Sequence, residues 1–378
     1  MKKDKKTTEA QELSPEEKEL QRIKRRKKKR MRTISVVVDR IFGVFLATGI
    51  MLGLAGLGLE YVLVKGPSPA LRDTFVMTML ETRRFDFIAN VFLSEDEVAA
   101  IKAQSYQYID EELDTSLISL PSKANPSEDP DSGSTLSSPS GADAYGLVDE
   151  DGDGYILESI YGNGYVGYVL TILDPTRVFV AKPDYYGGVG VKLGDFCKKY
   201  EAIGGINGGG FVDEGGGGLG GNPQGLLLVD GVCYNDGGGI PWSFAGFDAD
   251  GLLRVGYYTL EDARNLGIVS GVSFSPVLIY NGESVDPSVL SSGVNPRTAI
   301  AQRGDGAVIM LVIDGRQSHS MGATYQDVVD ILLERGAVNA CNMDGGSSTT
   351  MYLNGEYVNS CSSANGLARE LPNAFLFR

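Results

Sequence analysis

Residues 307–348 read AVIMLVIDGRQSHSMGATYQDVVDILLERGAVNACNMDGGSS, and this stretch decides the fold. Ala307–Ile313 is an apolar run of strand length, and Ala337–Met343 is a second one. Between them, TYQDVVDILLERGA predicts a helix that Thr324 caps and Gly336 ends. A crossover of this length allows the two strands to run parallel. The stretch therefore predicts a strand–helix–strand unit.

An aspartate follows each of these strands, Asp314 the first and Asp344 the second. Parallel strands end at the same edge of a sheet, and open α/β sheets bind ligands at that edge. The preceding hairpin, TAIAQRGDGAVIMLVIDGR, places Arg297 opposite Val312, about two residues from Asp314. Arg316 lies just beyond. Two carboxylates and two guanidiniums at one edge would suit an anionic or phosphorylated sugar.

A purely structural interpretation of these residues stays open. Asp-Gly pairs at strand ends are common turn chemistry, and the charged groups could form a network of salt bridges. The convergence of four charged groups with glycine-rich loops, which allow close approach to a ligand, favours a functional site.

The rest of residues 145–378 has the pattern of short strands joined by glycine turns. Hairpins are expected to turn at Gly162–Gly164, Asp230–Gly231 and Asn281–Gly282. We therefore predict an α+β fold, with a mixed β-sheet, packed helices and a C-terminal βαβ unit.

Charge is distributed unevenly along the 378 residues. Residues 1–65 hold 16 Lys and Arg against 8 Asp and Glu, a balance of +8, and residues 66–378 hold 18 against 41, a balance of −23. The acidic part argues against nucleic acid as a partner. A single histidine, His319, excludes a zinc site built from several histidines. The four cysteines include no CxxC pair, so they fit neither a zinc ribbon nor a disulfide-dense scaffold.

Residues 41–59, IFGVFLATGIMLGLAGLGL, are uncharged and mostly apolar. Extended to Val64, the segment is long enough to cross a hydrocarbon core of about 30 Å. A buried core helix would carry a polar face, and the apolar region of a signal peptide is usually shorter. The basic block Arg22–Arg32 then places the N-terminus in the cytoplasm and the residues after Lys65 outside the cell.

The stretch that follows the anchor contains two helical segments, the second with a capping box at Ser94 and Glu97. A Ser- and Pro-rich linker comes next, with a composition that cannot bury a core. The expected organisation is a cytoplasmic tail (1–40), a transmembrane anchor (41–64), a helical stalk (65–115), a disordered linker (116–144) and a catalytic domain (145–378).

Three familiar motifs are weak in this sequence. The glycines of GGGGLGG (215–221) lack the helix that a dinucleotide site needs after them. DEDGDG resembles the start of an EF-hand at Asp149, Asp151 and Asp153, so a divalent cation is conceivable, but the twelfth position is not Glu. A Ser-His-Asp triad drawn from Ser347, His319 and Asp314 has no G-x-S-x-G elbow, and we interpret the histidine as a polar loop residue.

Seven motifs in order carry a resemblance that covers roughly residues 147–378. They are NGGGF (207–211), NPQG (222–225), SFSPVLI (273–279), PRTAI (296–300), DGR (314–316), NMDGGSSTTM (342–351) and RELPNAF (369–375). Together they resemble the phosphodiester glycosidase family, which includes bacterial proteins described as exopolysaccharide biosynthesis proteins. The resemblance implies a membrane-tethered hydrolase that cleaves sugar-1-phosphodiesters on the glycosidic side, in envelope glycans or exopolysaccharide.

The resemblance also implies roles for residues. Asp314 and Asp344 would be base or nucleophile, and Arg297 would stabilise the leaving phosphate, with Arg316 as a weaker candidate. The remaining candidates would contact the sugar or the phosphate: Asn207, Gly208, Gly209, Gly345, Gly346, Ser347, Ser348 and Arg369. Arg369 would hold a substrate carboxylate or brace its loop. Ala301, where the family commonly has glycine, and the enlarged loop at 213–218 depart from the pattern.

Two other functions stay open at this point. A transferase could move a glycosyl phosphate onto a wall polymer with the same arginines, and a non-catalytic envelope protein could bind polysaccharide. No cofactor is predicted, and the expected partners are a phosphorylated glycan and the membrane.

Overall fold

The fold is described from a computed structural model. The described residues are 14–82, 86–104, 112–120, 143–212, 218–286, 290, 292–363 and 365–378. The chain divides into two compact units, residues 1–63 and 64–378.

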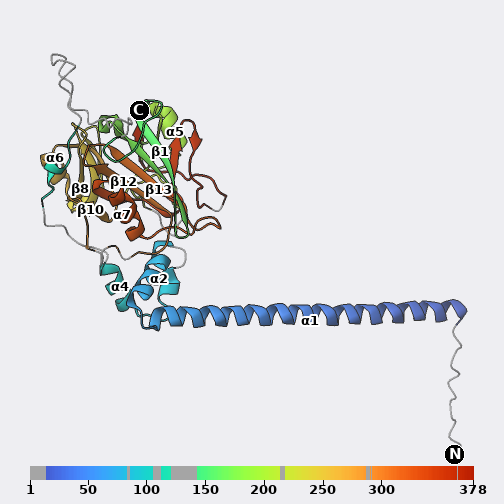
Figure 1. Cartoon of the computed structure of the whole chain (residues 1–378). Coiled ribbons are helices and arrows are strands. Elements are labelled where there is room, and N and C mark those ends of the chain that lie inside the picture. Colours follow the sequence, from blue (N-terminus) through green and yellow to red (C-terminus); the bar gives the residue numbers. More distant parts are fainter. Residues whose placement is uncertain are drawn as a thin grey trace, which may run out of the picture. The chain divides into compact units, whose positions relative to one another are not determined.

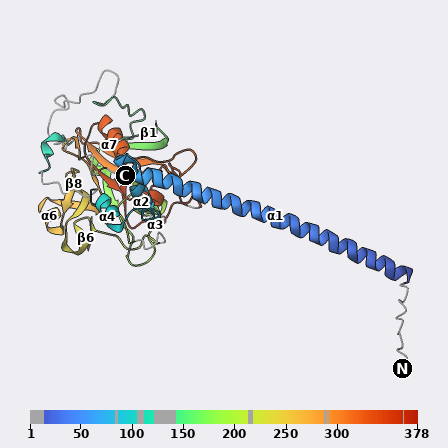
Figure 2. The ribbon, with the colours of Figure 1, turned by 90° about the horizontal axis from the view of Figure 1, so that it is seen from below.

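A single long helix, α1 (Pro15–Lys65), contains the apolar segment of the first unit; it is the long blue rod in Figure 1 and Figure 2. Side chains such as Phe45, Leu52 and Leu54 are exposed along it. By length and composition the helix could cross a membrane, although a signal sequence passes the same test. The membrane anchor therefore stays a prediction.

Three helices follow at the start of the second unit: α2 (Pro69–Thr82), α3 (Asp86–Ala89) and α4 (Glu95–Gln104). They bury a small apolar cluster that includes Val76 and Leu93. The capping box is confirmed, because the Ser94 N–H donates to the Glu97 carboxylate at 2.8 Å and the Glu97 N–H donates to Ser94 Oγ at 3.2 Å. Residues 105–111, the rest of the predicted second helix, lie outside the described residues.

The largest sheet holds the predicted unit. Its order is β1 (Tyr155–Gly162), β2 (Tyr165–Ile172), β13 (Val308–Ile313), β12 (Arg297–Arg303), β14 (Ala337–Met343), β10 (Val277–Tyr280) and β11 (Glu283–Ser284). Strands β13 and β14 are parallel to each other, as predicted, but β12 lies between them and pairs antiparallel with both. The expectation of a mixed sheet is thus corrected, since every pairing in this sheet is antiparallel.

Strand β13 is buried on both faces, which explains its continuous apolar sequence. Val308, Met310 and Val312 pack into one core, whereas Ile309 and Leu311 pack into another on the opposite face. The second core also contains side chains of helix α7 (Tyr325–Glu334). As predicted, Thr324 caps this helix, here through a capping box, and Gly336 follows it at φ 78°.

Two smaller sheets complete the domain. One has the order β16 (Glu356–Tyr357), β15 (Met351–Leu353), β4 (Gly204–Asn207), β17 (Ala374–Phe377) and β3 (Val178–Ala181). The other has the order β6 (Val232–Asp236), β5 (Leu226–Val229), β9 (Ile268–Ser273), β7 (Trp242–Asp248) and β8 (Leu253–Tyr258). Helices α5 (Leu193–Tyr200) and α6 (Leu260–Asn265) also belong to this domain. The α+β class is confirmed.

The predicted hairpin turns are also found. Gly162 pairs with Tyr165 across the first, and the residues of the other two have positive φ at Asp230 and Gly231 and at Asn281 and Gly282. The register of the β12–β13 hairpin was wrong by one residue, because the turn after Arg303 is one residue longer than expected. Arg297 faces Ile313 instead of Val312.

The two described ends of the predicted linker lie at that same β12–β13 turn. On one side, the Ser119 N–H donates to the Gly304 carbonyl at 2.8 Å. On the other, Asp143 accepts from the Arg303 guanidinium at 2.6 Å, and that guanidinium lies 4.2 Å from the Tyr145 ring centre. Residues 121–142, the greater part of the linker, lie outside the described residues.

Candidate functional site

The two strand-end aspartates lie where their strands place them, at one edge of the large sheet. The Asp314 N–H donates to the Val166 carbonyl at 2.9 Å, and the Asp344 N–H donates to the Gly208 carbonyl at 3.1 Å. The neighbouring strand β2 therefore fixes the backbone of Asp314, and the loop that follows β4 fixes the backbone of Asp344. Each position ends a strand of the buried core, which limits how far either can move.

A pocket of about 400 Å³ lies beside Asp314. Asp344 is not among the residues that line it, so the structure places only one of the two aspartates in this cavity. The lining is mixed, with polar and apolar side chains that include Tyr168, Asp314, His319, Tyr357, Asn359 and Leu367. Such a combination is typical of a site for a small polar ligand with apolar edges.

The Asp314 carboxylate is buried and surrounded by donors. Its side chain is 2% exposed. Oδ1 accepts from Asn359 Nδ2 and from the Ser360 N–H, both at 3.0 Å, and Oδ2 lies 3.1 Å from His319 Nε2. Because the side chain is shielded from water, these hydrogen bonds take the place of solvent around the carboxylate oxygens.

His319 is the functional candidate that sequence reasoning set aside. Its imidazole is 45% exposed, contacts the Asp314 carboxylate and lines the pocket. The sequence offered one signal: this is the only histidine in the chain, and it lies five residues after a candidate catalytic aspartate. The structure shows a His–Asp pair, and Ser347 Oγ accepts a hydrogen bond from Arg369 NH1.

Other titratable groups around the pocket keep their protons at neutral pH. Burial raises the pKa of Tyr168, and the Asp314 charge raises it further. Burial likewise raises the pKa of Tyr357 and of the Cys361 thiol. These side chains thus present neutral hydrogen-bonding groups to the cavity.

Asn207 is fully buried and forms internal hydrogen bonds. Its Nδ2 donates to the Asp344 carbonyl at 2.6 Å. Its Oδ1 accepts from Thr298 Oγ1 at 2.9 Å and from the Thr350 N–H at 3.1 Å. Asn207 thus connects strand β4 to the loop that carries Asp344, and its role as a sugar ligand stays a prediction.

The N–H groups of Gly208 and Gly209 are also used internally. Gly208 donates to the Asn373 carbonyl at 3.2 Å, and Gly209 donates to Asn373 Oδ1 at 2.6 Å. A Cβ on Gly209 would lie 2.5 Å from the Ser273 carbonyl oxygen. The glycines are therefore needed for close backbone packing, and the role of their N–H groups in sugar binding stays a prediction.

Arg297 lies inside the domain. Its Nε donates to the Ala323 carbonyl at 3.0 Å, its NH2 donates to the Gly293 carbonyl, and its guanidinium stacks on Tyr325 at 4.0 Å. The side chain is 3% exposed. Arg297 thus connects the loops at Gly293 and Ala323, and its role toward the leaving phosphate stays a prediction.

Arg316 and Arg369 flank the glycine turn that follows Asp344. Arg316 is exposed, its guanidinium binds Asn295 Oδ1 at 2.7 Å, and its NH1 lies 3.2 Å from where a Cβ on Gly346 would be. Arg369 NH1 donates to Ser347 Oγ at 3.1 Å, and its guanidinium lies 4.5 Å from the Phe211 ring centre. Two positive groups thus lie beside one short turn.

The turn itself is closely packed. The Gly346 N–H donates to the Pro296 carbonyl at 3.0 Å, and a Cβ on Gly345 would lie 2.9 Å from that same oxygen. Gly346 has φ 61°, which favours glycine. Ser348 is buried, and its Oγ has no hydrogen-bond partner among the described residues. The predicted turn residues thus form one compact element at the sheet edge.

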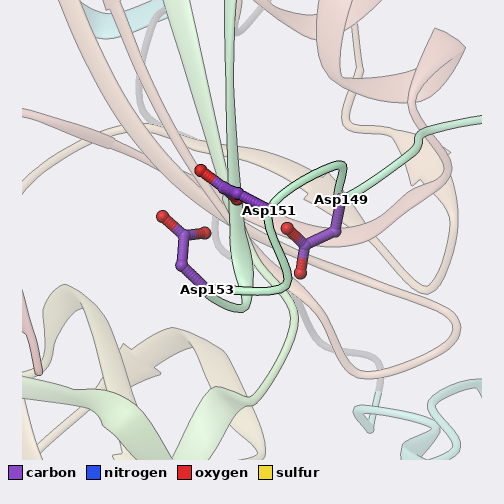
Figure 3. Close-up of side chains that lie close together, drawn as sticks. All are labelled: Asp149, Asp151 and Asp153. Atoms are coloured by element: carbon purple, nitrogen blue, oxygen red, sulfur yellow. The ribbon is translucent and has the colours of Figure 1, made fainter.

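The acidic motif near the start of the domain forms a tight turn. One carboxylate oxygen from each of Asp149, Asp151 and Asp153 lies within 4.8 Å of the other two. Figure 3 shows the three side chains close together on this turn. Asp149 accepts from the N–H groups of Gly152 and Gly154, both at 3.0 Å. Strand β1 follows in place of an EF-hand helix.

Comparisons with known proteins agree with this architecture. Residues 200–378 match the sequence profile of the phosphodiester glycosidase family. N-acetylglucosamine-1-phosphodiester alpha-N-acetylglucosaminidase of Mus musculus is 28% identical over 219 residues, covering 51% of this chain and 41% of the relative. The Homo sapiens protein is 28% identical over 215 residues, covering 50% and 40%. The SPbeta prophage-derived uncharacterized protein YomE of Bacillus subtilis is 30% identical over 152 residues, covering 38% and 24%.

A solved structure shares the fold. The catalytic domain of zebrafish N-acetylglucosamine-1-phosphodiester alpha-N-acetylglucosaminidase, auto-inhibited by its pro-peptide, aligns with a TM-score of 0.51 at 23% identity. The alignment covers 59% of this chain and 82% of that one. The chain spans less than half the length of the curated relatives that it matches. The match of residues 200–378 confirms the resemblance to the phosphodiester glycosidase family that the sequence motifs indicated.

Proposed function

We propose that the domain hydrolyses the glycosidic C–O bond of a sugar-1-phosphodiester. The observation that carries this proposal is the pocket in which a buried carboxylate, Asp314, holds the imidazole of His319. The family match and the names of the curated relatives support the same reaction class. A paired acid–base group in a cavity of this volume is suited to activating water beside a bound sugar.

Positive charge for the phosphodiester comes from Arg316 and Arg369 in this proposal. Arg316 follows Asp314 by two residues, and Arg369 directly follows the pocket residue Ala368. A phosphate monoester is a good leaving group that gains charge as the C–O bond breaks, so it needs charge stabilisation more than a proton. Guanidinium groups suit this role because they bind phosphate oxygens in pairs.

Asp344 is the second carboxylate of the proposed site. The contacts of Asn207 and Gly208 with its backbone hold it at the same sheet edge as Asp314. Its role would be to stabilise the oxocarbenium-like transition state or to attack it as a nucleophile. In that case Asp344→Asn abolishes turnover and leaves sugar-phosphate binding intact.

We further propose that α1 anchors the protein in a membrane, with the basic residues 22–32 on the cytoplasmic side and the domain outside. An envelope glycan or exopolysaccharide with sugar phosphodiester links is then the natural substrate. Residues 66–378 carry a net negative charge, which repels an anionic glycan chain. In this proposal Arg316 and Arg369 supply the positive charge that binds it.

Product analysis tests the proposed reaction. The purified full chain in detergent is incubated with the methyl phosphodiester of α-N-acetylglucosamine 1-phosphate in water enriched in oxygen-18. Glycosidic hydrolysis yields methyl phosphate and a free sugar that carries the label. Sugar 1-phosphate with methanol would instead reveal a phosphodiesterase, and transfer to an added sugar acceptor without labelled sugar would reveal a transferase.

A further inference from the structure

We propose that His319 is the general base of this reaction and that Asp314 is its positioning residue. The inference rests on the proposed function and assigns different roles to two groups that share one pocket. It begins from burial: the Asp314 side chain is 2% exposed and the imidazole 45% exposed. A ligand in the cavity therefore meets mainly the ring.

Asp314 is badly placed to attack a substrate. Its Oδ1 accepts two hydrogen bonds at 3.0 Å, from Asn359 Nδ2 and the Ser360 N–H, and its Oδ2 accepts from His319 at 3.1 Å. A nucleophile would have to give up such contacts as it formed a bond to carbon. An orienting carboxylate uses all of them throughout the reaction.

The contact also selects the tautomer of the imidazole. A carboxylate oxygen can only accept, so Nε2 carries the hydrogen and Nδ1 carries the basic lone pair. The atom that takes a proton from water is therefore Nδ1 of His319. Asp314 stabilises the imidazolium that forms, because its charge is already in place.

The loop of His319 is fixed well enough to hold this geometry. Ser320 Oγ donates to the Asp314 carbonyl at 2.6 Å and accepts from the Val166 N–H at 3.0 Å. Gln317 and Ser320 exchange two backbone hydrogen bonds at 3.0 and 3.2 Å. The imidazole is thus held on a closed turn that is tied to both strands beside it.

Other titratable groups that line the pocket are Asp314, Tyr168, Tyr357 and Cys361. Burial raises the pKa of both tyrosines and of the thiol, so these three keep their protons at neutral pH. The imidazole is therefore the exposed base of the pocket. In this proposal the fall in rate toward low pH, the acid limb of the profile, reflects protonation of that base.

The reaction balances with water as the only co-reactant. Water forms the new bond to the anomeric carbon and gives one proton to Nδ1. The bond from the anomeric carbon to the phosphate oxygen breaks, and its electron pair leaves with the phosphate monoester. The imidazolium then releases the proton to solvent, which restores the base.

The test compares the full chain in detergent with His319→Gln, Asp314→Asn and the control Ser318→Ala, a substitution of the exposed neighbour in the same loop. The substrate is the methyl phosphodiester described above, and kcat and KM are measured between pH 5 and 9. We expect His319→Gln to lower kcat by about 10²–10⁴-fold with KM nearly unchanged and to remove the acid limb. Asp314→Asn should lower kcat with KM nearly unchanged, because the imidazole loses the carboxylate that orients it, and Ser318→Ala should keep both rate and profile.

A second variant, His319→Gly, keeps the proposal testable through added imidazole, which should restore part of the rate. Full activity of His319→Gln, or an unchanged acid limb in it, would overturn the role of the histidine while leaving the hydrolase proposal in place. If the unmutated chain shows no turnover, the proposed function itself is overturned, and so is the role of His319 as general base. Thermal unfolding of each variant shows whether a lost rate reflects a lost fold.

Discussion

Single residues of the site divide into those that face the cavity and those that hold the backbone beneath it. Asp314 and His319 line the pocket, whereas Asn207 and Arg297 are buried and bonded to the chain. The sequence alone could not separate these two groups, because a buried structural asparagine and a ligand-binding asparagine are the same residue type. Burial and hydrogen-bond partners make the distinction.

At Asn207, replacement by alanine removes three buried hydrogen bonds at once. Each buried group left without a partner costs about 1–3 kcal/mol, so we expect the free energy of unfolding to fall by about 3 kcal/mol or more. Urea unfolding of the purified protein measures this. Asn265→Ala, at an exposed site in α6, should change stability by less than about 0.5 kcal/mol. Equal stability of both variants would show that the Asn207 contacts matter little.

Close packing at Gly209 leads to a second prediction. A methyl group there would lie 2.5 Å from a backbone oxygen, and backbone cannot move aside as a side chain can. We expect Gly209→Ala to lower the melting temperature by several degrees, since overpacking costs about 1–3 kcal/mol. Gly188→Ala is the matched control, because nothing lies within 4 Å of a Cβ at that position. A Gly209→Ala protein as stable as the control would contradict the packing explanation.

Among the elements, the strand–helix–strand unit could be predicted from sequence and the contacts at its ends could not. The apolar run of β13, the cap of α7 and the glycine stop after it each have a local cause that is visible in sequence. By contrast, the position of β12 between β13 and β14 depends on tertiary packing, which no local sequence pattern encodes. Residues 357–361, which line the pocket, come from a segment distant in sequence from Asp314. No local sequence pattern predicts that this segment contacts the aspartate.

The turn between β12 and β13 carries a pH-dependent contribution to stability. Burial alone would raise the pKa of Asp143, but the Leu147 N–H and the Arg303 guanidinium outweigh it and lower the pKa. A carboxylate with a lowered pKa in the folded state stabilises the protein above its unfolded pKa of about 3.9 and loses that contribution as pH falls. We expect Asp143→Asn to be less stable than the natural protein at pH 7 and the difference to shrink below about pH 4. A constant difference across pH would contradict this ion pair.

Over the whole molecule, the chain combines an apolar helix with an acidic domain that folds as a compact unit from residue 64 onward. We expect a variant with residues 1–63 deleted to move from the membrane fraction to the soluble fraction. Its turnover of a soluble phosphodiester should stay within about twofold, because every residue of the proposed site lies beyond the deletion. Fractionation by ultracentrifugation measures the first effect, and continued sedimentation with membranes would contradict the anchor.

The central claim is that the anomeric carbon of a sugar-1-phosphodiester is attacked in the pocket of Asp314 and His319. A crystal structure of the complex with a non-hydrolysable sugar-1-phosphonate analogue tests it most directly. We predict that the anomeric carbon lies within reach of one water bound to His319 Nδ1, with the phosphonate directed toward Arg316 and Arg369. A sugar bound elsewhere, with its anomeric carbon remote from the imidazole, would contradict the account.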